Sequence, residues 1–173
     1  KGIINFENTN NQTIYSDLRI NGKVIRIYNN HLQSINFLPE NYQFIDSLRF
    51  SYDEKQLKEI KEISKRLKTA FKKRAVQAKK VSEHINNCPY PVISLGDFND
   101  TPVSYAYRKM KMGLKDAYVQ KGKEISGKTY LGPLSFRIDY IMYSNHFDAM
   151  EYEKVEAKLS DHYPILARFH FNP

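Results

Sequence analysis

The sequence has a single cysteine, no tryptophan and no long apolar run. The one cysteine, Cys88, excludes an internal disulfide and leaves the redox compartment open. No apolar stretch approaches the roughly 18 residues that a transmembrane helix needs, and no signal peptide is recognisable. The chain starts at Lys1 without a methionine, so we expect a fragment or a processed product whose cellular location the sequence leaves unknown.

The composition indicates one globular domain. Apolar residues make up 41% of the 173 residues, which favours a domain with a substantial core over a disordered chain. The net charge of +8 suits a polyanionic partner, but eleven Lys or Arg against four Glu lie between residues 54 and 85. These basic residues mostly share one face of an amphipathic pattern. A solvated helix surface is therefore the favoured interpretation, and a phosphate-facing patch is the alternative.

Two segments carry strong local patterns. Residues 14–20 and 24–31 alternate, and Asn21-Gly22 between them is typical of a two-residue hairpin turn, because both residues tolerate positive φ. Over residues 54–85 apolar side chains recur at every third or fourth position, which predicts an amphipathic helix. As one rod this helix would run about 48 Å, so we expect a break near residues 68–73.

Shorter patterns predict the remaining elements. Thr101-Pro102 is typical of a helix start, with Thr at the cap and Pro at the first helical position, and this helix should end near Gly113. We also expect a short helix over residues 41–50 and strands over residues 91–95, 137–144 and 165–171. Together these elements predict an α/β (α+β) domain with a mixed, mostly antiparallel sheet and flanking helices.

Polar residues stand at the ends of the predicted strands, where they would share one edge of the sheet. Gly96-Asp97-Phe98-Asn99 follows a buried strand, and its carboxylate and carboxamide suit a hard cation or a phosphate. His31 ends a strand, Asp139 lies near the start of another, and Asp161-His162 precede the last. Asp139 would be costly to bury unpaired. His162 is a natural partner for it in a general-base pair.

Four motifs that contain these residues occur in a characteristic order. They are Asn30–Ser34 (NHLQS), Leu95–Pro102 (LGDFNDTP), Arg137–Ile141 (RIDYI) and Leu159–Pro164 (LSDHYP). By these motifs the chain resembles the endonuclease/exonuclease/phosphatase family, the deoxyribonuclease-I-like superfamily of metal-dependent phosphodiesterases and phosphomonoesterases. The resemblance runs from about residue 14 to the C-terminus.

The resemblance implies catalytic roles for five residues. Asp97 would orient or deprotonate the attacking water, and Asn99 would hold the scissile phosphate. His31 would contact the phosphate or assist the leaving group. Asp139 and His162 would form the carboxylate–imidazole pair of the family, with His162 acting on the phosphate or on the water.

The resemblance also implies a metal ligand and substrate contacts. Asp161 matches the aspartate that ligates Mg²⁺ (or Mn²⁺) directly or through water. Asn30 and Arg137, which lie within the motifs, are expected to bind substrate. Tyr130 beside Thr129 matches a weaker feature at the rim of the site. Arg74, with Gln77, falls where many members have a basic helix.

The chain departs from the family pattern at its front. The strand that carries an asparagine and the following glutamate, the principal metal ligand, are not recognisable, and Glu7 lacks their context. We therefore expect residues 1–173 to be one partial domain, the C-terminal part of a four-layer α/β-sandwich. Metal binding should then be weak. The apolar face of the sheet should be covered by a homodimer or by a neighbouring chain.

Two functions from different classes remain at this point. The leading one is a metal-dependent phosphoesterase that acts by in-line attack of water, with weak or no activity in this fragment. Nucleases, sphingomyelinase-like lipases and inositol-phosphate phosphatases share the motifs. The basic helix favours a nuclease slightly, whereas the lack of Trp and the 13 scattered Tyr do not suggest a base-stacking platform. The alternative is a non-catalytic basic module for nucleic-acid binding or protein interaction, which has no need of four ordered motifs.

Overall fold

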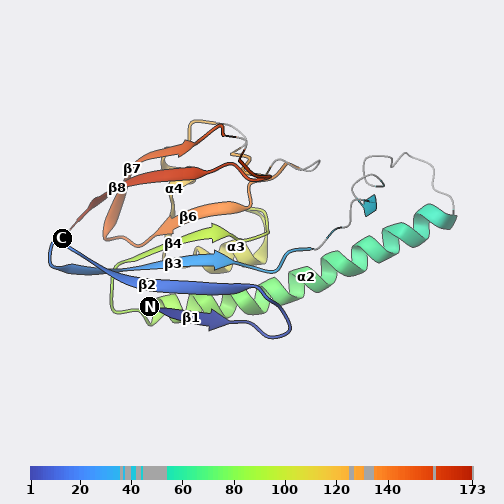
Figure 1. The fold of residues 1–173 in the computed structure, drawn as a ribbon, viewed down its shortest axis with the longest axis horizontal. Helices are drawn as coiled ribbons and strands as arrows, with labels where there is room; N and C mark the ends of the chain where they lie inside the picture. Colours follow the sequence, from blue (N-terminus) through green and yellow to red (C-terminus); the bar gives the residue numbers. More distant parts are fainter. Residues whose placement is uncertain are drawn as a thin grey trace.

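The computed structural model describes residues 1–35, 37, 40, 41, 44, 54–124, 127–130, 135–157 and 159–172. Strands β1 to β6 form one sheet in the order β1-β2-β3-β4-β6-β5, and β7 and β8 form a second, two-stranded sheet. Figure 1 shows the strands of the larger sheet side by side. The elements in chain order are β1 Gly2–Asn5, β2 Gln12–Ile20, β3 Lys23–His31, α2 Glu54–Asn86, β4 Val92–Asp97, α3 Tyr105–Met110, β5 Lys115–Asp116, α4 Ala117–Lys121, β6 Asp139–Tyr143, β7 Phe147–Lys154 and β8 Ile165–Phe171.

The predicted hairpin is confirmed as β2 and β3. Asn21 and Gly22 both have positive φ, at 49° and 80°, as a two-residue turn between twisted strands requires. β3 pairs with β4 in parallel, and the other pairs of the large sheet are antiparallel. The predicted α+β class with a mixed, mostly antiparallel sheet is therefore confirmed.

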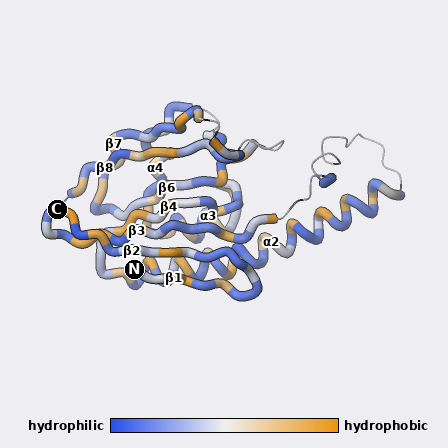
Figure 2. The backbone as a smooth tube through the Cα atoms, in the orientation of Figure 1, coloured by the Kyte–Doolittle hydropathy of each residue, from blue (hydrophilic) through white to orange (hydrophobic). Residues whose placement is uncertain are grey.

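Helix α2 is continuous over 33 residues, so the predicted break near residues 68–73 is wrong. No Gly or Pro interrupts the pattern there, and the helix of about 50 Å is accommodated because its N-terminal half extends beyond the end of the sheet (Figure 1). Its C-terminal half packs on the sheet through Ala78, Val81 and Ile85. Figure 2 shows the alternation of hydrophilic and hydrophobic residues along this helix. In the described part of the chain, no helix is both long and apolar enough to cross a lipid bilayer.

Helix α3 begins later than Thr101-Pro102 and ends earlier than Gly113. Ser104 is its N-cap, because the Ser104 hydroxyl accepts a hydrogen bond of 3.0 Å from the backbone N–H of Tyr107. Asp100 accepts the N–H of Thr101 instead, so that threonine belongs to the preceding turn. The helix predicted over residues 41–50 lies outside the described residues except at Asn41 and Phe44.

Both faces of the large sheet carry apolar side chains. One face packs against α2 and α3. The other packs against α4 and the β7–β8 pair. α4 and the β7–β8 pair cover the part of this face that is formed by β4 and β6. On β1 and β2, four apolar side chains of that face stay 42% to 57% exposed in the described structure, namely Ile3, Ile14, Leu18 and Ile20.

Candidate active site

The ends of three neighbouring strands bring polar residues to one edge of the sheet. Because β3 and β4 are parallel, both end at this edge, and His31 is paired with Asp97. β6 runs the other way and begins there, so Asp97 is also paired with Asp139. All three residues continue the face that packs on β7 and β8, since side chains alternate between faces along a strand.

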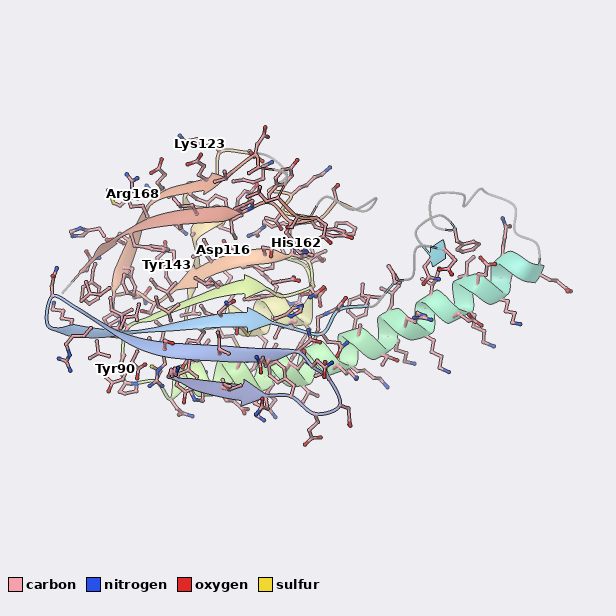
Figure 3. The ribbon with its side chains drawn as sticks, viewed as in Figure 1. Tyr90, Asp116, Lys123, Tyr143, His162 and Arg168 are labelled. Carbon is pink, nitrogen blue, oxygen red and sulfur yellow. The ribbon has the colours of Figure 1, made fainter. Side chains whose placement is uncertain are left out.

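The loop before β8 adds His162 to this edge. A single β-bridge joins Tyr130 to His162, and the two rings lie 5.2 Å apart. Figure 3 shows His162 at the end of the sheet toward which β3 and β4 point. The predicted meeting of the strand ends is therefore observed for Asp97, Asp139 and His162.

Asp97, Asp139 and His162 form a compact cluster whose nearest donor atoms all lie within 4.8 Å of one another. Nδ1 of His162 is 2.8 Å from Oδ2 of Asp139, and this hydrogen bond raises the pKa of the imidazole above its usual range. Burial, followed by the nearby charge of Asp139, raises the pKa of Asp97 to about 6. Two carboxylates beside an imidazole at the edge of a sheet, with the pKa values of Asp97 and His162 both raised, are a candidate catalytic site.

A tight turn after β4 holds Asp97 in place. The backbone N–H of Asn99 donates to Oδ1 of Asp97 at 2.7 Å, and Nδ2 of Asn99 donates to Oδ2 at 2.8 Å and to the carbonyl of Leu32 at 3.0 Å. Asn99 adopts a left-handed conformation with φ 52°. Gly96 has φ 123°, and a Cβ there would lie 2.1 Å from the carbonyl oxygen of Asn30. The motif therefore needs glycine for close strand packing and asparagine for the turn.

Thr129 connects the start of β6 to the loop that carries His162. Its buried hydroxyl accepts the backbone N–H groups of Ile138 and Asp139, each at 3.1 Å. Its carbonyl accepts the N–H of Tyr163 at 2.7 Å. The sequence points to Thr129 only as a neighbour of Tyr130, because a single threonine between loops is part of no local pattern.

A cavity of about 750 Å³ opens beside the cluster, a size common among small-molecule sites. Among the predicted site residues it is lined by His31, Arg74, Asp97, Asn99, Tyr130, Asp161 and His162. His31 and Asp161 are exposed, and neither belongs to the compact cluster. The sequence assigned the metal to Asp161, whereas in the described residues the close-set donors are Asp97, Asp139 and His162.

Arg74 forms part of the cavity wall rather than a free cationic side chain. It is fully buried, and it donates from Nε to Asp100 at 2.9 Å and from Nη1 to the carbonyl of Gln33 at 2.7 Å. Gln77 holds the same segment, because its Oε1 accepts the N–H of Gln33 at 2.8 Å. Arg74 thus ties helix α2 to the loops after β3 and β4.

The structure does not place Asn30 and Arg137 at the cavity. Asn30 faces helix α2, on the opposite side of β3 from His31, and its amide bonds to Thr13, Ser94 and the carbonyl of Leu95. Arg137 is buried, pairs with Asp116 at 2.7 Å and stacks on tyrosine rings. Both residues lie in the interior, and their expected substrate contacts stay a prediction. The alternation of side chains along a strand already predicts that Asn30 and His31 face opposite sides of the sheet. The buried position of Arg137, in contrast, depends on its pairing with Asp116, which is distant in sequence.

The donor set fits a divalent cation. Asp97 and Asp139 place two carboxylates close together, and the pKa of Asp97 is raised first by burial and then by the negative charge of Asp139. Carboxylate oxygens are preferred by Mg²⁺, and a histidine nitrogen is also accepted by Mn²⁺. The cluster found among the described residues contains no glutamate.

Comparison with known proteins identifies the class to which this fold and site belong. The sequence profile of the Endonuclease/Exonuclease/phosphatase family matches residues 63–162, which is more than half of the chain. The chain belongs to this family, whose members are typically hydrolases and usually use a divalent metal. None of the curated protein sequences matches it.

Solved structures share the fold at low sequence identity. The human Nocturnin catalytic domain with a bound sulfate anion is 20% identical, with a TM-score of 0.63 over 95% of this chain and 54% of its own. A humanized D. rerio TDP2 is 18% identical, with a TM-score of 0.64 over 98% and 65%. A Bacteroides thetaiotaomicron mannosyl-6-phosphatase is 17% identical, with a TM-score of 0.57 over 93% and 57%. The chain therefore spans about half to two thirds of the length of these structures.

Proposed function

We propose that this chain is the catalytic part of a metal-dependent phosphoesterase that hydrolyses phosphodiesters or phosphomonoesters by in-line attack of water. The observation that carries the proposal is the Asp97, Asp139 and His162 cluster, two of whose members, Asp97 and His162, line the cavity of about 750 Å³. In-line attack needs a group that orients the water on one side of the phosphorus and a proton donor for the developing charge. The cluster offers both kinds of group.

Asp97 is the residue that would orient the attacking water. Without a bound cation the pKa of about 6 already leaves its carboxylate ionised at neutral pH, and a cation held by the same carboxylate would favour this ionised form further. The two N–H donors of Asn99 hold both carboxylate oxygens, which fixes the direction of the group. The Asn99 side chain would then turn toward the phosphate when substrate displaces one of these bonds.

His162 would handle the proton at the phosphate. Its Nδ1 is held by Asp139, so Nε2 is the nitrogen left for a phosphoryl oxygen or a leaving group. The raised pKa favours the protonated ring, which both donates a proton and attracts the phosphate. His31 lines the same cavity and would contact a second phosphate oxygen.

Asp97 and Asp139 would hold the divalent cation, with Asp161 close by in the same cavity. Such an ion neutralises phosphoryl oxygens and lowers the pKa of a bound water. Because no glutamate joins the cluster within the described residues, we propose that the ion binds weakly to this chain and that the chain alone has weak or no activity. A nuclease activity is slightly favoured, since the basic surplus lies on α2, the helix that also contributes Leu67, Phe71 and Arg74 to the cavity wall.

The decisive experiment assays the parent protein with Mg²⁺ on plasmid DNA, sphingomyelin and inositol phosphates, with His162→Ala as the control. Hydrolysis of one of these esters that is lost in His162→Ala is the expected result. A folded parent protein that is inert on every phosphoester would overturn the proposal.

A second candidate function follows from the charge of α2. Its exposed lysines and arginines extend beyond the end of the sheet, where they could follow a phosphate backbone without any catalysis. Salt-dependent DNA binding that survives the double change Asp97→Ala and His162→Ala, in a protein without hydrolytic activity, would favour this module over an enzyme.

We also propose that the uncovered apolar face of β1 and β2 is buried in a homodimer or against a neighbouring chain. The four exposed side chains Ile3, Ile14, Leu18 and Ile20 lie on one face of adjacent strands, which is the arrangement that a second sheet covers.

A further inference from the structure

The cavity beside the cluster is also lined by apolar side chains, several of them from helix α2. We call four of them the apolar arm: Leu67 and Phe71 of α2, and Phe136 and Ile138, which precede β6. The arm and the cluster line one continuous cavity, so a ligand at the cluster can extend into the arm.

The apolar arm is not needed for either hydrophobic core. None of its four residues belongs to the clusters on the two faces of the sheet. Phe71 and Phe136 stay 48% and 46% exposed, although they line a concave site. Large apolar side chains that are left in contact with water inside a cavity are typical of ligand sites, because the ligand completes their burial.

The chemistry of the arm favours an aromatic ring. It offers two phenyl rings from segments far apart in the sequence, and the guanidinium carbon of Arg74 lies over the ring of Phe71, 4.9 Å from its centroid, which restrains that ring. Aromatic groups stack on such rings with a gain beyond area burial. Leu67 and Phe71 carry no hydrogen-bonding side-chain atoms, so they offer nothing that would select the hydroxyl groups of a sugar or inositol ring.

We propose that the substrate is a phosphoester of an aromatic group, with the phosphate at Asp97 and His162 and the ring in the apolar arm. This inference rests on the proposed phosphoesterase function and adds the class of substrate. A nucleobase and a simple aryl ester share this chemistry, and the test below separates them.

Binding to the 173-residue chain is measured by amide chemical-shift titration in Mg²⁺ with four probes: methylphosphonate, phenylphosphonate, hexylphosphonate and a nucleoside monophosphate. We expect phenylphosphonate to bind about tenfold more tightly than methylphosphonate, as burial of one phenyl ring predicts. Tighter binding of the nucleotide than of phenylphosphonate assigns the ring to a base, and the reverse assigns it to an aryl ester.

Variants test the location of the ring. Phe71→Ala and Leu67→Ala should remove most of the phenyl preference and leave methylphosphonate binding unchanged. Val76→Ala is the matched control, because Val76 is on the same helix, is 71% exposed and does not line the cavity. Circular dichroism of each variant verifies that α2 stays folded.

The other possible outcomes contradict either the ring site or the phosphate site. Equal affinity for methylphosphonate and phenylphosphonate overturns the ring site while leaving the phosphoesterase proposal intact. Tighter binding of hexylphosphonate than of phenylphosphonate also overturns it, in favour of an alkyl substrate. If no phosphonate binds and the His162 signals do not move, the phosphate site itself is contradicted, and the ring assignment fails with it.

Discussion

Asp139 and His162 are the pair through which the site controls protons. The carboxylate holds Nδ1 of the imidazole at 2.8 Å, and Asp97 and Asp161 add further negative charge around it. These charges favour the protonated form of the imidazole. The bond from Nδ1 to Asp139 also fixes the direction in which Nε2 points. A single residue change can test this bias directly.

We expect Asp139→Asn to lower the pKa of His162, because the neutral amide no longer stabilises the imidazolium. The measurement is an NMR titration of the His162 ring protons in metal-free buffer. Asp161→Asn is the control, since Asp161 is exposed and its charge is the smallest of the effects on His162. An equal decrease in both variants would contradict the specific role of Asp139.

Thr129 is a positioning residue for the same pair. Thr129→Val keeps the shape of the side chain but leaves two buried N–H groups without their acceptor, and we expect it to destabilise the fold by about 1–3 kcal/mol. It should also move the pKa of His162 back toward its ordinary value, since Asp139 loses its anchor. Urea unfolding and the same NMR titration measure both effects.

Thr129→Ser retains the hydroxyl and should restore the pKa of His162 and most of the stability. If Thr129→Val and wild type share one His162 titration curve, the threonine is only a packing residue.

At the scale of elements, helix α2 is joined to strand β3 by a partly buried polar contact. Nδ1 of His84 lies 2.8 Å from the hydroxyl of Tyr28, and burial, helped by the charge of Arg26, lowers the pKa of His84. The unfolded chain therefore binds the His84 proton more readily than the folded chain. This contribution to stability is present above about pH 6.5 and is lost as the pH falls toward the lowered folded pKa.

We expect the stability difference between wild type and His84→Asn to shrink between pH 7.5 and pH 5. Urea unfolding at several pH values measures it, and taking the difference cancels the other titrating groups. His146→Asn is a control on an exposed histidine near β7. If the stability difference instead grows toward low pH, folding raises the pKa of His84 rather than lowering it, and the prediction is wrong.

The elements also show where local patterns suffice and where they do not. The β2–β3 hairpin follows from alternation and from Asn21-Gly22, because its contacts are close in sequence. The unbroken course of α2 was missed, since domain size is a weak guide when a helix can project beyond its sheet. The short elements β5 and α4 carry no pattern of their own, and Asp116 caps α4 while pairing with the distant Arg137.

At the scale of the whole molecule, the second cover of the sheet is incomplete within the described residues. β7 and β8 protect the part of the face formed by β4 and β6, whereas Ile3, Ile14, Leu18 and Ile20 stay exposed. Burial of these side chains is worth about 25 cal/mol per Å² of apolar area, which favours association.

We expect the 173-residue chain to sediment as a dimer at micromolar concentration and Leu18→Lys to shift it toward monomer. Val103→Lys serves as the control, because Val103 is 82% exposed and lies in the segment between β4 and α3. A wild-type chain that stays monomeric at all concentrations contradicts the dimer and favours a neighbouring chain as the cover.

The affinity for a metal ion is also a property of the whole molecule, because the ligands of a cation site come from several strands along the edge of the sheet. We expect Mg²⁺ or Mn²⁺ to bind with a Kd of about 10⁻⁴ M or weaker, as measured by isothermal titration, and the double variant Asp97→Asn, Asp139→Asn to abolish it. Tight binding by the wild-type chain would refute the weak site.

The family, the fold class and the candidate polar residues can be recognised from the sequence, because ordered motifs and strand periodicity are local properties of the chain. The tertiary structure determines which candidates meet. It brought Asp97, Asp139 and His162 within 4.8 Å, turned Asn30 and Arg137 into the interior, and placed Phe71 and Phe136 along one cavity. These positions depend on strand register and on contacts between distant segments, because the burial of a side chain is determined by its neighbours in space.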